Sequence, residues 1–177
     1  MIPQKVWSTT VRGRCAWSLF IGEHGCLGIR FDEASRKRMM LAYEIGWKWV
    51  AGEQIANEDL YLILESENEE DCLLIDTSVF PENSPGYWNV ALTPIVYVVW
   101  WMKYLEGVKS VSTTVYETIA DRFETFYQSL VELGLEDLAT RILNQIVQMF
   151  PTTAPDDLGS PFDRNELLSR LALDISV

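Results

Sequence analysis

His24 and Cys26 are the residues whose types and spacing could support nucleophilic catalysis. The 177-residue chain contains one histidine, so any His-paired serine or cysteine nucleophile would have to use this imidazole. Gly22, Gly25 and Gly28 surround the pair and predict a turn. Side chains two residues apart usually point in different directions, and placement of His24 on the surface explains the pattern equally well. The sequence therefore gives little support to an enzyme.

Neither a metal site nor a phosphate-binding loop is visible in the sequence. Cys15, Cys26 and Cys72 lack the paired spacing of structural zinc sites, and their odd number does not indicate a disulfide framework. We interpret them as small buried hydrophobic residues. The carboxylates at positions 65, 67, 69, 70 and 71 do not follow the alternating ligand pattern of a calcium loop. An acidic, solvated turn is the favoured interpretation, and we expect no metal or cofactor.

The negative charge is distributed unevenly along the chain, whose formal charge is −12. Residues 1–48 contain eight Lys and Arg against four Asp and Glu, whereas residues 49–102 contain ten Asp and Glu and neither Lys nor Arg. A field of this sign repels phosphate backbones, so we expect no nucleic-acid partner. It would attract a basic protein and accelerate the encounter. For the charge taken alone, solubility is an equally good explanation.

Two acidic features are candidates for binding a protein partner. The first is the loop that contains Glu65, Glu67, Glu69, Glu70 and Asp71. The second is a polar stripe on a predicted helix, with Asp121, Glu124 and Glu132. A helix presents its charges at fixed spacing, which suits a rigid partner, whereas an acidic loop loses conformational entropy when it binds.

Hydrophobic periodicity predicts helices that would position these features. The predicted helices cover residues 33–50, 58–65, 87–106, 114–133 and 136–150, with weaker signals over 6–21 and from Ser160 onward. Asp32, Asn57 and Ser160 are predicted N-caps, and Gly52 and Gly134 are predicted helix ends. We therefore expect an all-α fold, a single domain over residues 1–177 with a bundle of five to seven helices. A short extended segment near residues 72–80 remains an alternative to another helix there.

The longest apolar stretch, Tyr87 to Met102, is too short for a membrane span and contains Pro94. We expect it to form a buried central helix. Trp47, Trp49, Trp100 and Trp101 are interpreted as core residues, although one of the adjacent pair Trp100 and Trp101 could reach the surface. The sequence does not begin with a secretory signal pattern, so we expect a cytoplasmic protein.

The sequence resembles the small all-helical immunity proteins of bacterial polymorphic toxin systems. The likeness lies in the segment Arg38-Met-Met-Leu-Ala-Tyr-Glu-Ile-Gly-Trp-Lys-Trp-Val-Ala-Gly-Glu53, followed by Leu60-Tyr61. It extends over about residues 30–135 and includes the aromatic central helix and the helix after it. The motifs contain no catalytic signature.

This resemblance implies a stoichiometric inhibitor that binds a cognate toxin domain and blocks its active site or the approach of its substrate. Many such toxins are basic nucleases, which would account for the acidic charge. No functional residue is carried over, because immunity contacts vary with the toxin. The alternatives are a helical adaptor or regulatory module without a toxin partner, and an enzyme of unfamiliar type.

Overall fold

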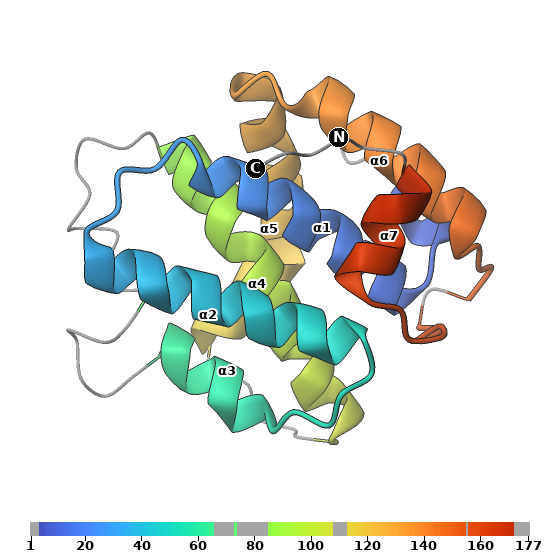
Figure 1. The fold of residues 1–177 in the computed structure, drawn as a ribbon, viewed down its shortest axis with the longest axis horizontal. Helices are drawn as coiled ribbons and strands as arrows, with labels where there is room; N and C mark the ends of the chain where they lie inside the picture. The colour runs from blue at the N-terminus through green and yellow to red at the C-terminus, as the bar shows by residue number, and fades with distance from the viewer. Residues whose placement is uncertain (1–3, 66–72, 74–84, 108–112, 155, 172–177) are drawn as a thin grey trace.

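The computed structural model describes residues 4–65, 73, 85–107, 113–154 and 156–171, with residues 113–122 described by their backbone only. These residues form a 3₁₀ helix and seven α-helices, and they contain no β-strand (Figure 1). The elements are η1 (Gln4–Ser8), α1 (Val11–Cys26), α2 (Glu33–Val50), α3 (Asn57–Leu64), α4 (Pro85–Leu105), α5 (Thr113–Glu132), α6 (Glu136–Met149) and α7 (Arg164–Leu171). The predicted all-α bundle is confirmed. The proposed extended segment near 72–80 lies outside the described residues, except for Leu73.

Helix α1 is the central element of the bundle. It contacts α2, α4 and α6, and in Figure 1 it crosses the middle of the molecule between α2 and α6. Apolar residues all around it, including Cys15, Leu19 and Ile21, are completely buried. A helix that is hydrophobic on every side belongs inside a protein, which is where α1 lies.

The prediction of a turn around His24 is wrong, because α1 continues to Cys26 and includes Gly22 and Gly25. These glycines allow α1 and α4 to pack closely. A Cβ atom added to Gly22 would lie 2.1 Å from Tyr43 Oη and 3.0 Å from Val90 O. One added to Gly25 would lie 2.6 Å from Val90 Cγ1. The helix starts at Val11 instead of near residue 6, because the Thr10 side chain accepts a hydrogen bond from Gly13 N and caps it.

Helix α4 is the buried central helix that its apolar sequence predicts. Pro94 lies within it, so the proline does not end the helix. Proline has no N–H to donate to the carbonyl four residues earlier, which here is that of Val90. The carbonyl of the following residue, Ala91, accepts a 2.6 Å hydrogen bond from Tyr43 Oη. Within the described residues, no helix combines the length and the apolar character needed to cross a membrane.

The helix ends agree with the sequence at some positions and differ at others. Asp32 caps α2 by accepting from Ser35 N at 2.8 Å, and Gly52 and Gly134 end helices with positive φ angles of 84° and 70°. Asn57 is the first residue of α3 and not its cap; it is buried, and its amide donates to Glu106.

The last helix begins at Arg164, not at Ser160 and Pro161 as predicted. Asp163 Oδ1 accepts from Glu166 N at 2.8 Å and so provides the cap. Phe162 stacks on Phe150 with ring centroids 4.0 Å apart and is buried. Phe162 N also donates to the carbonyl oxygen of Val50, at the end of α2, at 3.5 Å. These contacts hold Phe162 against the ends of α6 and α2, and the chain turns into α7 only after it.

We expect Gly22→Ala to lower the free energy of unfolding by about 1–3 kcal/mol or more, because the new methyl group meets Tyr43 and the backbone of α4. Gly46→Ala is the matched control. It adds a methyl group to the interior of α2, where the nearest atom is the mobile Cδ2 of Leu19 at 3.1 Å, and its effect should stay below about 1 kcal/mol. Urea unfolding measures both variants, and equal stabilities would contradict the close-packing account.

Candidate functional site

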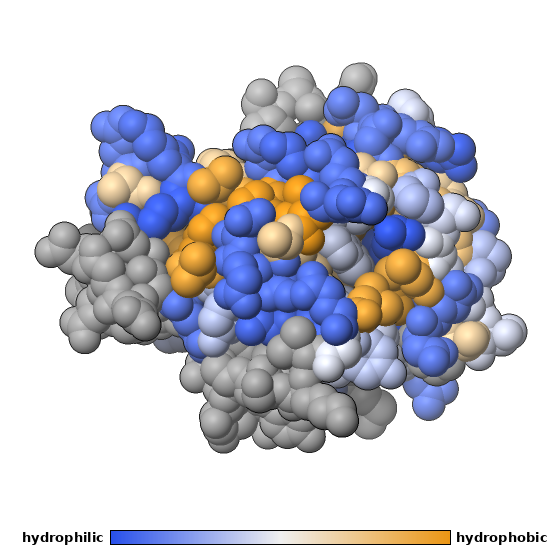
Figure 2. Space-filling view, turned by 90° about the horizontal axis from the view of Figure 1, so that it is seen from below, coloured by the Kyte–Doolittle hydropathy of each residue, from blue (hydrophilic) through white to orange (hydrophobic). Residues whose placement is uncertain are grey.

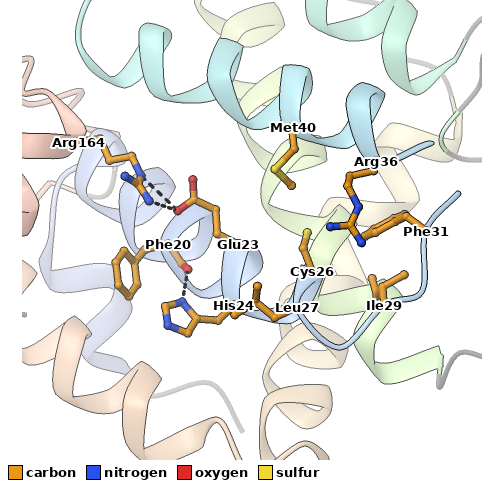
Figure 3. A pocket seen from close by; sticks show the side chains of 10 residues that line it. All are labelled: Phe20, Glu23, His24, Cys26, Leu27, Ile29, Phe31, Arg36, Met40 and Arg164. Carbon is orange, nitrogen blue, oxygen red and sulfur yellow. Dashed lines mark hydrogen bonds and ion pairs between the residues drawn. The ribbon is translucent and has the colours of Figure 1, made fainter. Parts of the chain in front are cut away.

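A pocket of about 360 Å³ opens between α1 and α2, and both His24 and Cys26 line it (Figure 3). Its other lining residues are five apolar and three charged side chains: Phe20, Leu27, Ile29, Phe31 and Met40, with Glu23, Arg36 and Arg164. Phe20 and Ile29 are buried, whereas Leu27 and Met40 are exposed at its edge.

The two residues that could perform nucleophilic chemistry are directed apart inside this pocket. His24 Nδ1 lies 3.1 Å from the carbonyl oxygen of Phe20, one helical turn earlier, and the two rings pack with centroids 5.0 Å apart. In Figure 3 the Cys26 side chain points away from His24. Burial raises the pKa of the Cys26 thiol to about 12. A thiol in this state is a poor nucleophile, so the pair does not form a nucleophile and base.

Glu23, a charged residue that lines the pocket, contributes to the stability of the fold. Glu23 accepts a hydrogen bond from Trp47 Nε1 at 3.0 Å and two from Arg164, at 2.9 and 3.2 Å. The guanidinium of Arg164 also lies over the Trp47 ring, 6.0 Å from its centroid. These contacts join α1, α2 and α7. The carboxylate is therefore engaged in holding three helices together.

A second polar group is buried on the far side of α1. Arg14 is completely inaccessible. It donates to Tyr97 Oη at 3.0 Å and to the carbonyl oxygen of Thr9 at 2.7 Å, and its guanidinium lies over the rings of Trp7 and Trp101. Like Glu23, this charged side chain is used for packing.

The predicted acidic loop is only partly described. Glu65 directly follows α3, is half-buried, and accepts a hydrogen bond from Tyr61 Oη. Glu67, Glu69, Glu70 and Asp71 lie outside the described residues. Among the described residues, no group of three or more His, Cys, Asp or Glu side chains could hold a metal ion.

The predicted acidic stripe lies on α5. Asp121 is in this helix, but its side chain is outside the description; Glu124 is half-buried and Glu132 is exposed. The C-terminal end of α5 is at the top of Figure 1, whereas α3 is at the bottom. Glu132 and Glu65 are therefore far apart and do not share a patch. The two predicted features remain separate candidates for binding.

The sequence analysis did not identify two exposed hydrophobic residues on α2 and α3. Leu41 on α2 and Leu62 on α3 are 46% and 56% exposed. The helical pattern of α3 contained the signal for Leu62, because placing Leu60, Ile63 and Leu64 in the core directs Leu62 outward. The predicted tryptophan core is confirmed: Trp47, Trp49 and Trp101 are buried, and Trp100 is half-buried and stacks on Tyr104.

These observations define an all-α protein with a pocket between α1 and α2 and with acidic and hydrophobic side chains exposed on its helices. The model of the family Immunity protein Imm6 matches residues 13–133. The chain belongs to this family, and the resemblance to immunity proteins of toxin systems is confirmed. The match begins within α1, earlier than the likeness near residue 30. Comparisons with curated proteins and with solved structures find no match.

We expect Glu23→Ala to lower the free energy of unfolding by about 1–3 kcal/mol, because it removes charge-assisted hydrogen bonds that join three helices. Glu44→Ala is the control, since Glu44 pairs with Lys48 on the exposed side of α2 and should cost less than about 0.5 kcal/mol. Chemical denaturation compares the two. Equal losses would contradict the structural role of Glu23.

We also expect stability to fall in alkaline solution. Cys15 and Cys26 are buried, and burial raises both thiol pKa values above the ordinary 9.0. Above pH 9 the unfolded chain therefore releases protons that the folded chain retains, and the free energy of unfolding decreases as pH rises. Each thiol should contribute about 1.4 kcal/mol to this loss by pH 10.

Urea unfolding at pH 8 and pH 10 measures the alkaline loss. Cys26→Ala should be less stable than the parent at pH 8 but should lose less stability between the two values. An identical pH dependence in parent and variant would show that the thiol of Cys26 ionises normally in the folded protein.

Proposed function

We propose that this chain is a cytoplasmic immunity protein that binds one cognate bacterial toxin domain and neutralises it without catalysing a reaction. The observation that carries the proposal is membership of the family Immunity protein Imm6 over residues 13–133. An immunity protein must have a toxin as its partner. Its mechanism is occupancy: the bound protein covers the active site of the toxin or obstructs its substrate.

The partner that the charge favours is a basic toxin domain, with a nuclease as the first activity to test. Enzymes that act on nucleic acids need positive surfaces to bind phosphates. The immunity protein has a formal charge of −12, with the acidic residues concentrated beyond residue 48. Opposite charges accelerate association, which matters for an inhibitor that must reach the toxin before the toxin reaches its substrate.

The proposed action requires a rigid surface and no cofactor. Two charged side chains within the bundle, Glu23 and Arg14, are occupied by contacts between helices. The carboxylates at the surface are therefore the groups that a partner would meet. Glu65 with the loop after it, and the α5 stripe of Asp121, Glu124 and Glu132, are the acidic features proposed for binding.

Co-expression with the cognate toxin domain tests the proposal. We expect a large secreted protein with a variable C-terminal domain to be encoded beside the gene for this chain, and that domain is the probe. We expect cells that produce both proteins at equal levels to survive, and the two proteins to purify as a 1:1 complex. An adaptor without a toxin partner would give no protection, and death of the cells at equimolar expression would overturn the proposal.

A further inference from the structure

The lower face of the bundle exposes hydrophobic side chains from α2 and α3. Leu41 and Leu62 are 46% and 56% exposed. Ile45, one helical turn after Leu41, and Ile63, next to Leu62 in the sequence, are half-buried. Figure 2 looks at this face, where α3 and α2 lie lowest in Figure 1, and hydrophobic residues gather on it among hydrophilic ones. Exposed apolar patches with a polar rim are typical of surfaces that bind other proteins.

Acidic residues surround Leu62 on its own helix. Glu58, Asp59 and Glu65 are four residues before it, three before it and three after it, spacings that place side chains next to one another on a helix surface. Glu58 and Asp59 are exposed. The sequence contains no Lys or Arg between residues 49 and 102. Lys103 of α4 places its ammonium over the Tyr61 ring, 3.4 Å from the ring centroid. The three carboxylates around Leu62 outnumber this cation, so the charge beside the exposed leucine is negative on balance.

The basic residues of α2 are engaged along their own helix or lie at the pocket. Lys37 pairs with Glu33 at 2.7 Å, and Lys48 pairs with Glu44 at 2.6 Å. Arg38 donates to Ser35 Oγ at 3.1 Å, and Arg36 lines the pocket between α1 and α2. The α2 side of the face is apolar at Leu41, and the α3 side is acidic at Glu58 and Asp59.

The α5 stripe offers less to a partner. Of its two carboxylates with described side chains, Glu124 is half-buried and Glu132 is exposed. Val131, 47% exposed, is the exposed large hydrophobic residue beside them. Buried apolar anchors contribute most of the affinity at protein interfaces, and charges at the rim mainly set the association rate. The α2–α3 face has both components together.

We propose that the α2–α3 face, formed by Leu41 and Leu62 with Glu58, Asp59 and Glu65, is the surface that binds the toxin domain. It fits a partner surface on which an apolar group is flanked by Lys or Arg side chains. The apolar groups pack over Leu41 and Leu62, and the basic side chains meet the carboxylates of α3. This inference rests on the proposed function, because it names the surface through which that function operates.

Binding of the purified toxin domain encoded beside the gene tests the inference, with the full-length chain as its partner. Leu62→Arg removes the apolar anchor and places a positive charge opposite a basic partner surface. We therefore expect the Kd of the complex with the toxin domain to rise at least about 30-fold. Glu58→Lys with Asp59→Lys should slow association by about tenfold at low salt and by much less at high salt. Both changes are at exposed positions, and thermal unfolding checks that each variant folds.

Val131→Arg is the matched control, because it makes the same change in charge at a similarly exposed aliphatic residue of α5. We expect its Kd to equal that of the parent. If Val131→Arg weakens binding and Leu62→Arg does not, the interface is on α5; the inference is then overturned and the proposed function stands. If the parent protein fails to bind the toxin domain at all, the proposed function fails first.

Self-association is the other possible use of this face. Sedimentation of the parent chain and of Leu62→Arg without toxin distinguishes it. We expect both to sediment as monomers. A dimer that Leu62→Arg dissociates, with toxin binding unchanged, would assign the face to a second copy of the chain and overturn the inference.

Discussion

The fold depends on the close contact between α1 and α4. Gly22 and Gly25 leave the surface of α1 free of side chains where Val90, Pro94 and Tyr43 approach it. This contact brings two strongly apolar helices together, and the remaining helices pack around them. Because the interior is closely packed, even one additional methyl group at Gly22 would force atoms apart. The same contact determines how α2, which provides Tyr43, sits against the central pair.

The chemistry of the side chains follows from this packing. His24 and Cys26 lie at the C-terminal end of α1, where the imidazole packs on Phe20 and the thiol is buried. Glu23 and Arg14 are engaged by neighbouring helices. These two charged side chains therefore serve the structure. What the bundle presents outward is a pattern of charge and apolar surface, and such a pattern suits recognition of another protein.

Much of the fold could be predicted from the sequence, since periodic apolar residues and strong caps such as Asp32 and Gly52 act locally. The errors arose where a distant contact decides the local structure. Gly22 and Gly25 indicated a turn because glycine is common in turns, but here they make room for α4. Likewise, Ser160 and Pro161 formed a plausible helix start, yet the stacking of Phe162 on Phe150 moves the start to Arg164.

The candidate site was less accessible to sequence reasoning. Charge could be counted along the chain, so Glu65 and Glu132 both appeared as candidates. That their helices end far apart depends on the packing of the bundle, which a count of charges does not contain (Figure 1). The exposure of Leu41 depends on how α2 packs against its neighbours. Periodicity alone does not decide which of two adjacent apolar residues of a helix faces the solvent. Membership of an immunity family could be recognised from the sequence, because it depends on the types and order of the residues and not on their arrangement in space.

We propose that the protein acts by covering a toxin domain with its α2–α3 face. Hydrogen–deuterium exchange, measured on the chain alone and saturated with the toxin domain, tests this most directly. We expect slower exchange in the complex over residues 57–65 and over the adjoining part of α2, with α6 unchanged. Slower exchange confined to α5, or none anywhere under saturation, would contradict it.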